Sequence, residues 1–119
     1  MKVFVTGVGG QLGHDVINEL DKRGHIGIGS DLHETYSGIQ DNSAVTKAQY
    51  VSLDITNEKD VMDTILSIKP DAIIHCAAWT AVDLAEDDDK IEKVRLVNVK
   101  GTENIAKAAK AVNCKCLYL

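Results

Sequence analysis

The sequence predicts a doubly wound α/β fold, in which a parallel sheet of about five strands lies between two layers of helices. Two observations predict it. Short runs of β-branched residues alternate with segments of helical periodicity along the chain. Apolar residues make up 45% of the 119 residues, which is enough to build a core. Strands that alternate with helices pair in parallel through right-handed crossovers, so we expect one three-layer domain over residues 1–119.

Five segments have the composition of strands, namely residues 2–6, 26–31, 50–53, 72–78 and 115–119. The second contains Gly27 and Gly29, which weaken its strand character. The fourth is apolar almost throughout, as expected of a strand that is covered on both faces. We therefore expect the fourth strand to lie inside the sheet.

Helical periodicity joins these strands in three places. The apolar positions that recur at helical spacing are Leu12, Val16, Ile17 and Leu20, then Val61, Ile65 and Ile68, then Val94, Val97, Gly101, Ile105, Ala108 and Val112. We expect the first helix to stop at Gly24. The second should begin at Thr56 or Asn57 and end at Pro70. Each helix would then present one apolar face to the sheet.

Charge and the length of apolar runs exclude several classes of protein. Lys and Arg number 13 against 18 Asp and Glu, and the resulting net charge of -5 argues against nucleic-acid binding. No apolar run approaches the roughly 20 residues that a membrane-spanning helix needs. The first residues also lack the apolar stretch of a signal peptide. We therefore expect a soluble, cytoplasmic protein that binds neither nucleic acid nor membranes.

The three cysteines, Cys76, Cys114 and Cys116, are expected to be small buried apolar residues. An odd number in a chain without secretion signals makes disulfides improbable, and the spacing of the last two differs from that of zinc sites. Acidic residues gather between positions 83 and 92, where a solvated helix start is favoured over a cation site. We therefore predict no metal site.

The junction of the first strand and the first helix, residues 6–13, carries the pattern Thr-Gly-x-x-Gly-x-x-Gly. Gly7 permits a tight turn, Gly10 lets the backbone approach a pyrophosphate, and Gly13 allows close packing of the helix. The helix N-terminus offers N–H groups and a positive dipole end to phosphates. This pattern in a strand–turn–helix context predicts a dinucleotide-binding fold of the Rossmann type.

Asp31, at the end of the second strand, supports the same interpretation. It follows Gly13 by 18 residues, near the spacing of about 20 that is typical of dinucleotide-binding folds. Its carboxylate can accept hydrogen bonds from the ribose hydroxyls of adenosine. It would repel a 2′-phosphate, because Leu32, His33 and Glu34 bring no Lys or Arg. We therefore expect NADH to be preferred over NADPH; the alternative is that Asp31 is a solvated turn residue.

The glycine pattern resembles that of the extended short-chain dehydrogenase/reductase superfamily. Residues 53–56 (Leu-Asp-Ile-Thr) look like the segment of this superfamily that carries an acidic residue after the third strand. Residues 97–102 (Val-Asn-Val-Lys-Gly-Thr) look like its helix with an inward Asn. Residues 77–86 (Ala-Ala-Trp-Thr-Ala-Val-Asp-Leu-Ala-Glu) are similar to a segment typical of dTDP-4-dehydrorhamnose reductases. With residues 10–13 (Gly-Gln-Leu-Gly), these segments are distributed along most of the chain, from residue 10 to residue 102.

This resemblance implies the last step of dTDP-L-rhamnose synthesis, the reduction of the 4-keto group of dTDP-6-deoxy-L-lyxo-4-hexulose by NADPH or NADH, both of which the family commonly accepts. It implies that Asp54 and Ile55 flank the adenine and that residues 77–79 line the path to the nicotinamide ribose. The full cofactor-binding set predicted from the pattern and the resemblance is Gly7, Gly10, Gln11, Leu12, Gly13, Asp31, Leu32, Asp54, Ile55, Ala77, Ala78, Trp79, Thr80, Asn98 and Leu119.

The proton donor of the superfamily is a Tyr-x-x-x-Lys pair, and this sequence contains none. Gln40 and Asp54 stand four residues after Tyr36 and Tyr50, and Tyr118 is followed by a single residue. The family's Ser/Thr-bearing motif is expected directly after the last residue. We therefore expect no catalytic residue here: the chain would be the inactive, cofactor-binding N-terminal part of a longer enzyme whose remainder binds the dTDP-sugar.

Two other functions stay open at this point. One is a non-catalytic regulatory subunit of the same fold, and the other is a nucleotide-sugar epimerase or dehydratase, because the long stretch over residues 32–49 resembles that of epimerases. A homodimer is also left open. His75 is expected to be a hydrogen-bonded core histidine. For Asn98, a place near the active site and a structural position in the core are almost equally expected.

Overall fold

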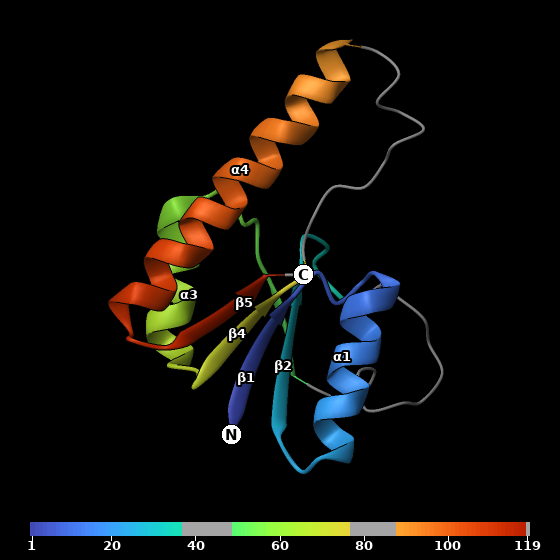
Figure 1. The fold of residues 1–119 in the computed structure, drawn as a ribbon, viewed down its shortest axis with the longest axis vertical. Coiled ribbons are helices and arrows are strands. Elements are labelled where there is room, and N and C mark those ends of the chain that lie inside the picture. Colours follow the sequence, from blue (N-terminus) through green and yellow to red (C-terminus); the bar gives the residue numbers. More distant parts are fainter. Residues whose placement is uncertain (37–48, 77–87, 119) are drawn as a thin grey trace.

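The computed structural model describes residues 1–36, 49–76 and 88–118, with residues 88–97 as backbone only. Five strands form one parallel sheet of order β3-β2-β1-β4-β5 (Figure 1). The strands are β1 Lys2–Thr6, β2 Ile26–Asp31, β3 Gln49–Ser52, β4 Ala72–His75 and β5 Lys115–Tyr118, and the helices are α1 Gln11–Lys22, α3 Glu58–Ile68 and α4 Asp88–Ala111. The predicted doubly wound, Rossmann-type fold is confirmed.

The helices cover opposite faces of the sheet. α1 packs against β1 and β2 on one face, whereas α3 and α4 pack together over the other (Figure 1). The chain moves from β1 outward to β2 and β3, then returns across the sheet to β4 and β5. The direction of winding therefore reverses between β1 and β4. In open α/β sheets, ligands bind at such a switch point, beyond the carboxyl ends of the strands.

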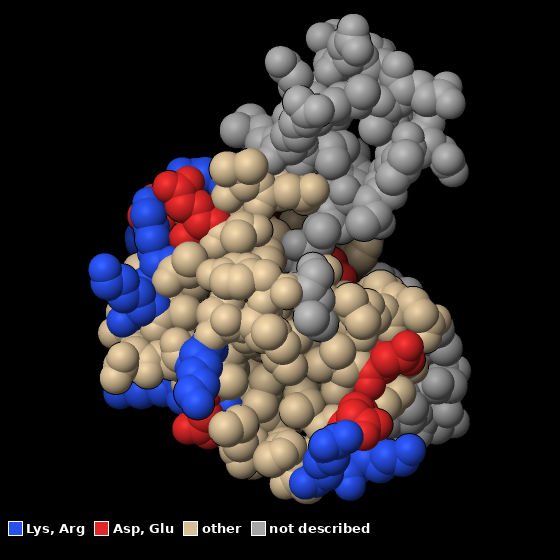
Figure 2. Space-filling view, viewed as in Figure 1, with Lys and Arg blue, Asp and Glu red and all other residues tan. Residues whose placement is uncertain are grey.

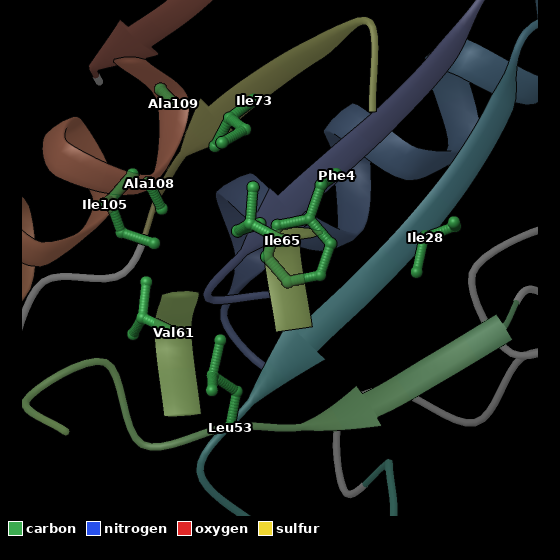
Figure 3. Close-up of a cluster of buried hydrophobic side chains, with 9 residues drawn as sticks. All are labelled: Phe4, Ile28, Leu53, Val61, Ile65, Ile73, Ile105, Ala108 and Ala109. Carbon is green, nitrogen blue, oxygen red and sulfur yellow. The ribbon is translucent and has the colours of Figure 1, made fainter. Parts of the chain in front are cut away.

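Side chains alternate along β1 and fill both sides of the sheet. Phe4 is fully buried in the cluster under α3 and α4, where it lies near Ile65 (Figure 3). Val3 and Val5 point to the opposite face and pack with Ile17 of α1. Because both of its faces are covered, β1 is apolar along most of its length.

The predicted ends of the helices are confirmed at their capping residues. Gly24 follows the end of α1 with a φ of 79°. Asn57 is the N-cap of α3, since its side-chain oxygen accepts the Asp60 N–H at 3.1 Å. The helix ends directly before Lys69, which adopts the left-handed conformation with a φ of 50°, and Pro70 follows. Local capping chemistry therefore defines these boundaries.

Two predicted details of the elements differ from the structure. Leu12 is 50% exposed, whereas Gly13, His14 and Ile17 are the buried residues of α1. The first turn of α1 stands at the carboxyl end of β1, where the sheet ends, so a side chain at residue 12 has no strand to cover. β3 begins and ends one residue earlier than predicted, and β4 ends at His75, with residues 77 and 78 outside the described part.

Charged side chains of both signs lie mainly toward the margins of the face seen in Figure 2, and uncharged side chains occupy most of its centre. In the part of the chain that the structure describes, no helix has both the length and the apolar character needed to cross a membrane.

Candidate functional site

The candidate site is the glycine-rich turn between β1 and α1, at the switch point of the sheet. Gly7 leaves β1 in the left-handed conformation, with a φ of 73°, and its carbonyl accepts the Gly10 N–H at 3.1 Å. Val8 fixes the turn to the core and to β2, because its side chain is buried and its N–H donates to the Ser30 carbonyl of β2 at 3.1 Å. Gly7 therefore makes a tight turn that is fixed to the neighbouring strand.

The other two glycines of the pattern have different surroundings. A Cβ on Gly13 would lie 2.8 Å from the carbonyl carbon of Gly7 and from the Cα of Val8, so the close approach of α1 to the turn requires glycine there. A Cβ on Gly10 would meet only the Gly7 carbonyl oxygen, at an ordinary 3.5 Å, and Gly10 is exposed. Nothing in the described part of the chain requires glycine at residue 10. The space in front of it is open.

Backbone donors of α1 face this space. Gly10 is the N-cap of the helix, and an α-helix leaves its first N–H groups without partners inside the helix. Gln11 and Leu12, the first two helical residues, are exposed, and the first turn contains no acidic side chain. The dipole of the helix adds a partial positive charge at this end. The site therefore suits a phosphate, which can approach closely because Gly10 has no side chain.

Asp31 connects the end of β2 to the glycine turn. Its Oδ2 accepts the Gly9 N–H at 2.8 Å, and its Oδ1 accepts the Leu32 N–H at 2.8 Å. The Leu53 N–H donates to the Asp31 carbonyl at 2.9 Å, which fixes the backbone as well. A carboxylate has about four acceptor positions, so two protein donors leave capacity for further hydroxyl groups. Asp31 is therefore a fixed acceptor beside the turn and more than a solvated turn residue.

The residues that follow β3 are held by short contacts. Asp54 Oδ1 accepts the Thr56 N–H at 3.0 Å and the Thr56 hydroxyl at 2.6 Å, which closes a turn before α3. The Ile55 side chain packs so closely on Gly101 of α4 that a Cβ there would come within 2.8 Å of Ile55 Cγ1. The Ile55 carbonyl accepts from Asn104, which is 1% exposed and was not predicted as part of the site. A sequence pattern could not have identified Asn104, because the partner of an Asn on a helix is not set by the spacing of residues along the chain.

The remaining predicted residues divide into two groups. Asn98 lies on α4 and is partly buried. The others lie outside the described residues, namely Ala77, Ala78, Trp79, Thr80 and Leu119.

A hydrogen-bonded histidine lies at the carboxyl end of β4, beside Thr6, the last residue of β1. His75 is 4% exposed, and its Nδ1 shares a hydrogen bond of 2.7 Å with Thr6 Oγ1 and its Nε2 one of 3.1 Å with Thr102 Oγ1. Thr6 Oγ1 also accepts the Cys76 N–H at 3.1 Å. The prediction of a core histidine is confirmed. Thr6 and Thr102 were missed, since they stand 69 and 27 residues away in sequence.

The environment of His75 predicts a loss of stability in acid. Burial lowers the pKa of His75, so the folded chain disfavours the imidazolium that the unfolded chain forms below its ordinary pKa of about 6.5. The stabilising effect of the neutral ring is complete above that value and is lost as pH falls through it. We expect the free energy of unfolding, from urea titrations, to fall more steeply between pH 7.5 and 5.5 in the native chain than in His75→Gln. Equal slopes would contradict this prediction.

The cysteines lie partly buried against the core as free thiols. Burial raises the pKa of the thiols of Cys76, Cys114 and Cys116, which favours the protonated form. Among the residues that the structure describes, no three His, Cys, Asp or Glu side chains are placed to hold a metal ion. The acidic residues Asp83, Glu86 and Asp87 lie outside that part.

Comparison with known proteins gives a family match along the entire chain. A family model described as "RmlD substrate binding domain" matches residues 1–119. The dTDP-4-dehydrorhamnose reductase of Escherichia coli (strain K12) is 35% identical over 119 residues, which cover 99% of this chain and 34% of that protein. A UDP-glucose 4-epimerase of Mycolicibacterium smegmatis is 33% identical over 114 residues, which cover 92% and 35%. This chain spans about a third of the length of these relatives.

Two solved structures show the same arrangement of elements. A dTDP-4-dehydrorhamnose reductase from Clostridium acetobutylicum matches with a TM-score of 0.74 at 30% identity, over 98% of this chain and 34% of that one. The Bordetella bronchiseptica enzyme WbmH, solved in complex with NAD+, matches with a TM-score of 0.71 at 30% identity, over 94% and 36%. Because the family model spans every residue, and reductases of this type match by both sequence and structure, the chain belongs to the RmlD family of dTDP-4-dehydrorhamnose reductases.

Proposed function

We propose that these 119 residues bind NADH or NADPH at the β1–α1 turn for the reduction of the 4-keto group of dTDP-6-deoxy-L-lyxo-4-hexulose to dTDP-L-rhamnose. The observation that carries the proposal is the position of Gly10. It is exposed, a Cβ on it would meet only one ordinary contact, it is the N-cap of α1, and its neighbour Gly9 donates to the carboxylate of Asp31. Membership of the RmlD family supports the choice of sugar.

The roles of the residues follow from their contacts. The N–H groups of Gln11 and Leu12 would donate to the pyrophosphate, and Asp31 would accept from a ribose hydroxyl. Gly7 and Gly13 would hold the turn in shape. When bound, the dinucleotide supplies the hydride that reduces a carbonyl. Further residues proposed to line the cofactor site are Leu32, Asp54, Ile55, Ala77, Ala78, Trp79, Thr80, Asn98 and Leu119.

The reaction also needs a proton donor beside the carbonyl, and the sequence contains no Tyr with a Lys four residues later. We infer that these residues bind the dinucleotide without reducing the sugar by themselves. Titration of the chain with NADH and NADPH, followed by addition of the keto sugar, tests both parts. Saturable binding without NADH oxidation is expected. Failure to saturate with either dinucleotide would contradict the proposed function.

Asp31 is expected to favour NADH over NADPH. Asp31→Asn keeps an oxygen that can accept from Gly9 but removes the charge that would repel a 2′-phosphate. Asp31→Ala removes the hydrogen bond to the turn as well. We expect Asn to weaken NADH binding about tenfold, the order for a hydrogen bond to a charged group, without weakening NADPH binding. Ala should weaken NADH further. Tighter binding of NADPH than of NADH by the native chain would contradict the role of Asp31.

A nucleotide-sugar epimerase is the second candidate, because the chain is 33% identical to a UDP-glucose 4-epimerase over 114 residues. An epimerase regenerates its cofactor in each turnover and retains it, whereas a reductase must exchange it. Assay of the dinucleotide released when purified protein is denatured separates the two functions. A stoichiometric amount would favour the epimerase, and an empty site that fills on titration would favour the reductase.

A further inference from the structure

A cluster of aromatic side chains joins α1 to the segment that follows β2. His14 stands one residue after Gly13 and is 3% exposed. Its Nδ1 shares a hydrogen bond of 2.6 Å with the Tyr36 hydroxyl, and the two rings stack with centroids 6.3 Å apart at 21°. The helix that begins at the glycine turn is therefore bound directly to residue 36.

A second tyrosine continues the cluster to β3. The rings of Tyr36 and Tyr50 meet edge to face, with centroids 6.1 Å apart at 64°. The Tyr50 hydroxyl donates to the His33 carbonyl at 2.6 Å. Burial raises the pKa of Tyr50, and the nearby Asp31 carboxylate raises it further, so this hydroxyl keeps its proton and remains a donor. We call His14, Tyr36 and Tyr50 the aromatic clamp.

The clamp fixes a short segment that begins directly after Asp31. Residues 32–36 are bound at the Leu32 N–H by Asp31, at the His33 carbonyl by Tyr50 and at the Tyr36 hydroxyl by His14. Most of the segment is exposed and lies outside helices and strands. Its position therefore depends on these side-chain contacts.

We propose that the aromatic clamp positions residues 32–36 beside the adenosine ribose and thereby sets the choice between NADH and NADPH. The inference rests on the proposed dinucleotide binding. The Gly9 and Leu32 N–H groups hold the carboxylate of Asp31, and the clamp holds the segment that begins with Leu32 and carries Glu34, a second negative charge. If the segment loosens, Asp31 loses the fixed Leu32 N–H that orients its Oδ1, so NADH meets a less ordered acceptor. A 2′-phosphate then meets less repulsion from Glu34.

Tyr36→Phe removes one hydroxyl of the clamp and keeps the ring. We expect the ratio of the dissociation constants for NADPH and NADH to fall about three- to tenfold, which is the loss expected for one hydrogen bond. His14→Gln should lower the ratio less, since Gln retains a group that can bond to Tyr36. In the double variant the ratio should match that of Tyr36→Phe alone, because both changes act through one contact. Tyr118→Phe, which removes a hydroxyl on β5, is the matched control and should leave the ratio unchanged.

The measurements are calorimetric titrations of the 119-residue chain with NADH and with NADPH, together with the urea midpoint of each variant. A lower ratio in Tyr36→Phe but not in Tyr118→Phe would support the clamp. Equal weakening of both dinucleotides would show a merely structural role and would overturn the inference, as would an unchanged ratio. With either of these two outcomes, saturable binding of a dinucleotide by the native chain would still support the proposed function. If the native chain binds neither dinucleotide, both proposals fall.

Discussion

Gly13→Ala is expected to destabilise the chain by about 3 kcal/mol, the upper part of the range for overpacked sites. The new Cβ would lie 2.8 Å from two backbone atoms, the Gly7 carbonyl carbon and the Val8 Cα. Backbone cannot rotate away as a side chain can, so α1 would have to move off the turn. Because small domains are stable by only about 5–15 kcal/mol, the loss should be large enough to measure easily in a urea titration followed by circular dichroism.

Gly27→Ala is the matched control for this change. Its Cβ would also meet a close neighbour, Ile17 Cδ1 at 3.0 Å, but that atom is the end of a flexible side chain. We expect Gly27→Ala to change the free energy of unfolding by less than about 1 kcal/mol. If the two variants unfold at the same urea concentration, the close packing of α1 on the turn is not what requires Gly13.

Gly10→Val is expected to abolish binding of both NADH and NADPH while the chain stays folded. The Gly10 backbone is extended, with φ -88° and ψ 166°, which suits a β-branched residue, and a Cβ there meets only one ordinary contact. The cost to stability should be about 1 kcal/mol, because valine is a poorer N-cap than glycine. The valine side chain would occupy the open space in front of α1, where the pyrophosphate is proposed to lie.

Gly24→Asn, at the other end of α1, provides the control for Gly10→Val. Gly24 has a φ of 79°, a conformation that Asn tolerates, and a Cβ there would meet nothing within 4 Å. This variant should bind both dinucleotides as the native chain does. Calorimetric titrations of the two variants decide the matter. Undiminished binding by Gly10→Val would show that the turn is a structural feature and would remove the main support for dinucleotide binding there.

The sequence predicted the architecture well because its signals are local. Capping by Asn57, the stop at Gly24 and the strand composition of residues 2–6 each depend on a few neighbouring residues. Leu12 shows the limit of periodicity. A repeat of three and four places it on the same helical face as Val16, but it cannot show that the sheet ends before the first turn of the helix.

Contacts between distant residues could not be predicted in this way. His14 and Tyr36 are 22 residues apart, and Thr6 and His75 are 69 apart. No local spacing pattern predicts either pair, because the residues of each pair meet only after the chain has crossed over and returned to a neighbouring part of the fold. The polar partners around a site are therefore visible only in the folded chain.

The sequence alone determined the parallel α/β fold and the family resemblance, since periodicity, capping and the glycine pattern are encoded in short segments. It also predicted separate roles for Gly7, Gly10 and Gly13 and an acceptor at Asp31. Only the tertiary structure gave the contacts behind these roles: a Cβ on Gly13 would meet the backbone of the turn, a Cβ on Gly10 would meet a single ordinary contact, and Asp31 accepts from the Gly9 N–H. The physical reason is that a residue type fixes which contacts are allowed, whereas packing of distant strands and helices decides which of them are made.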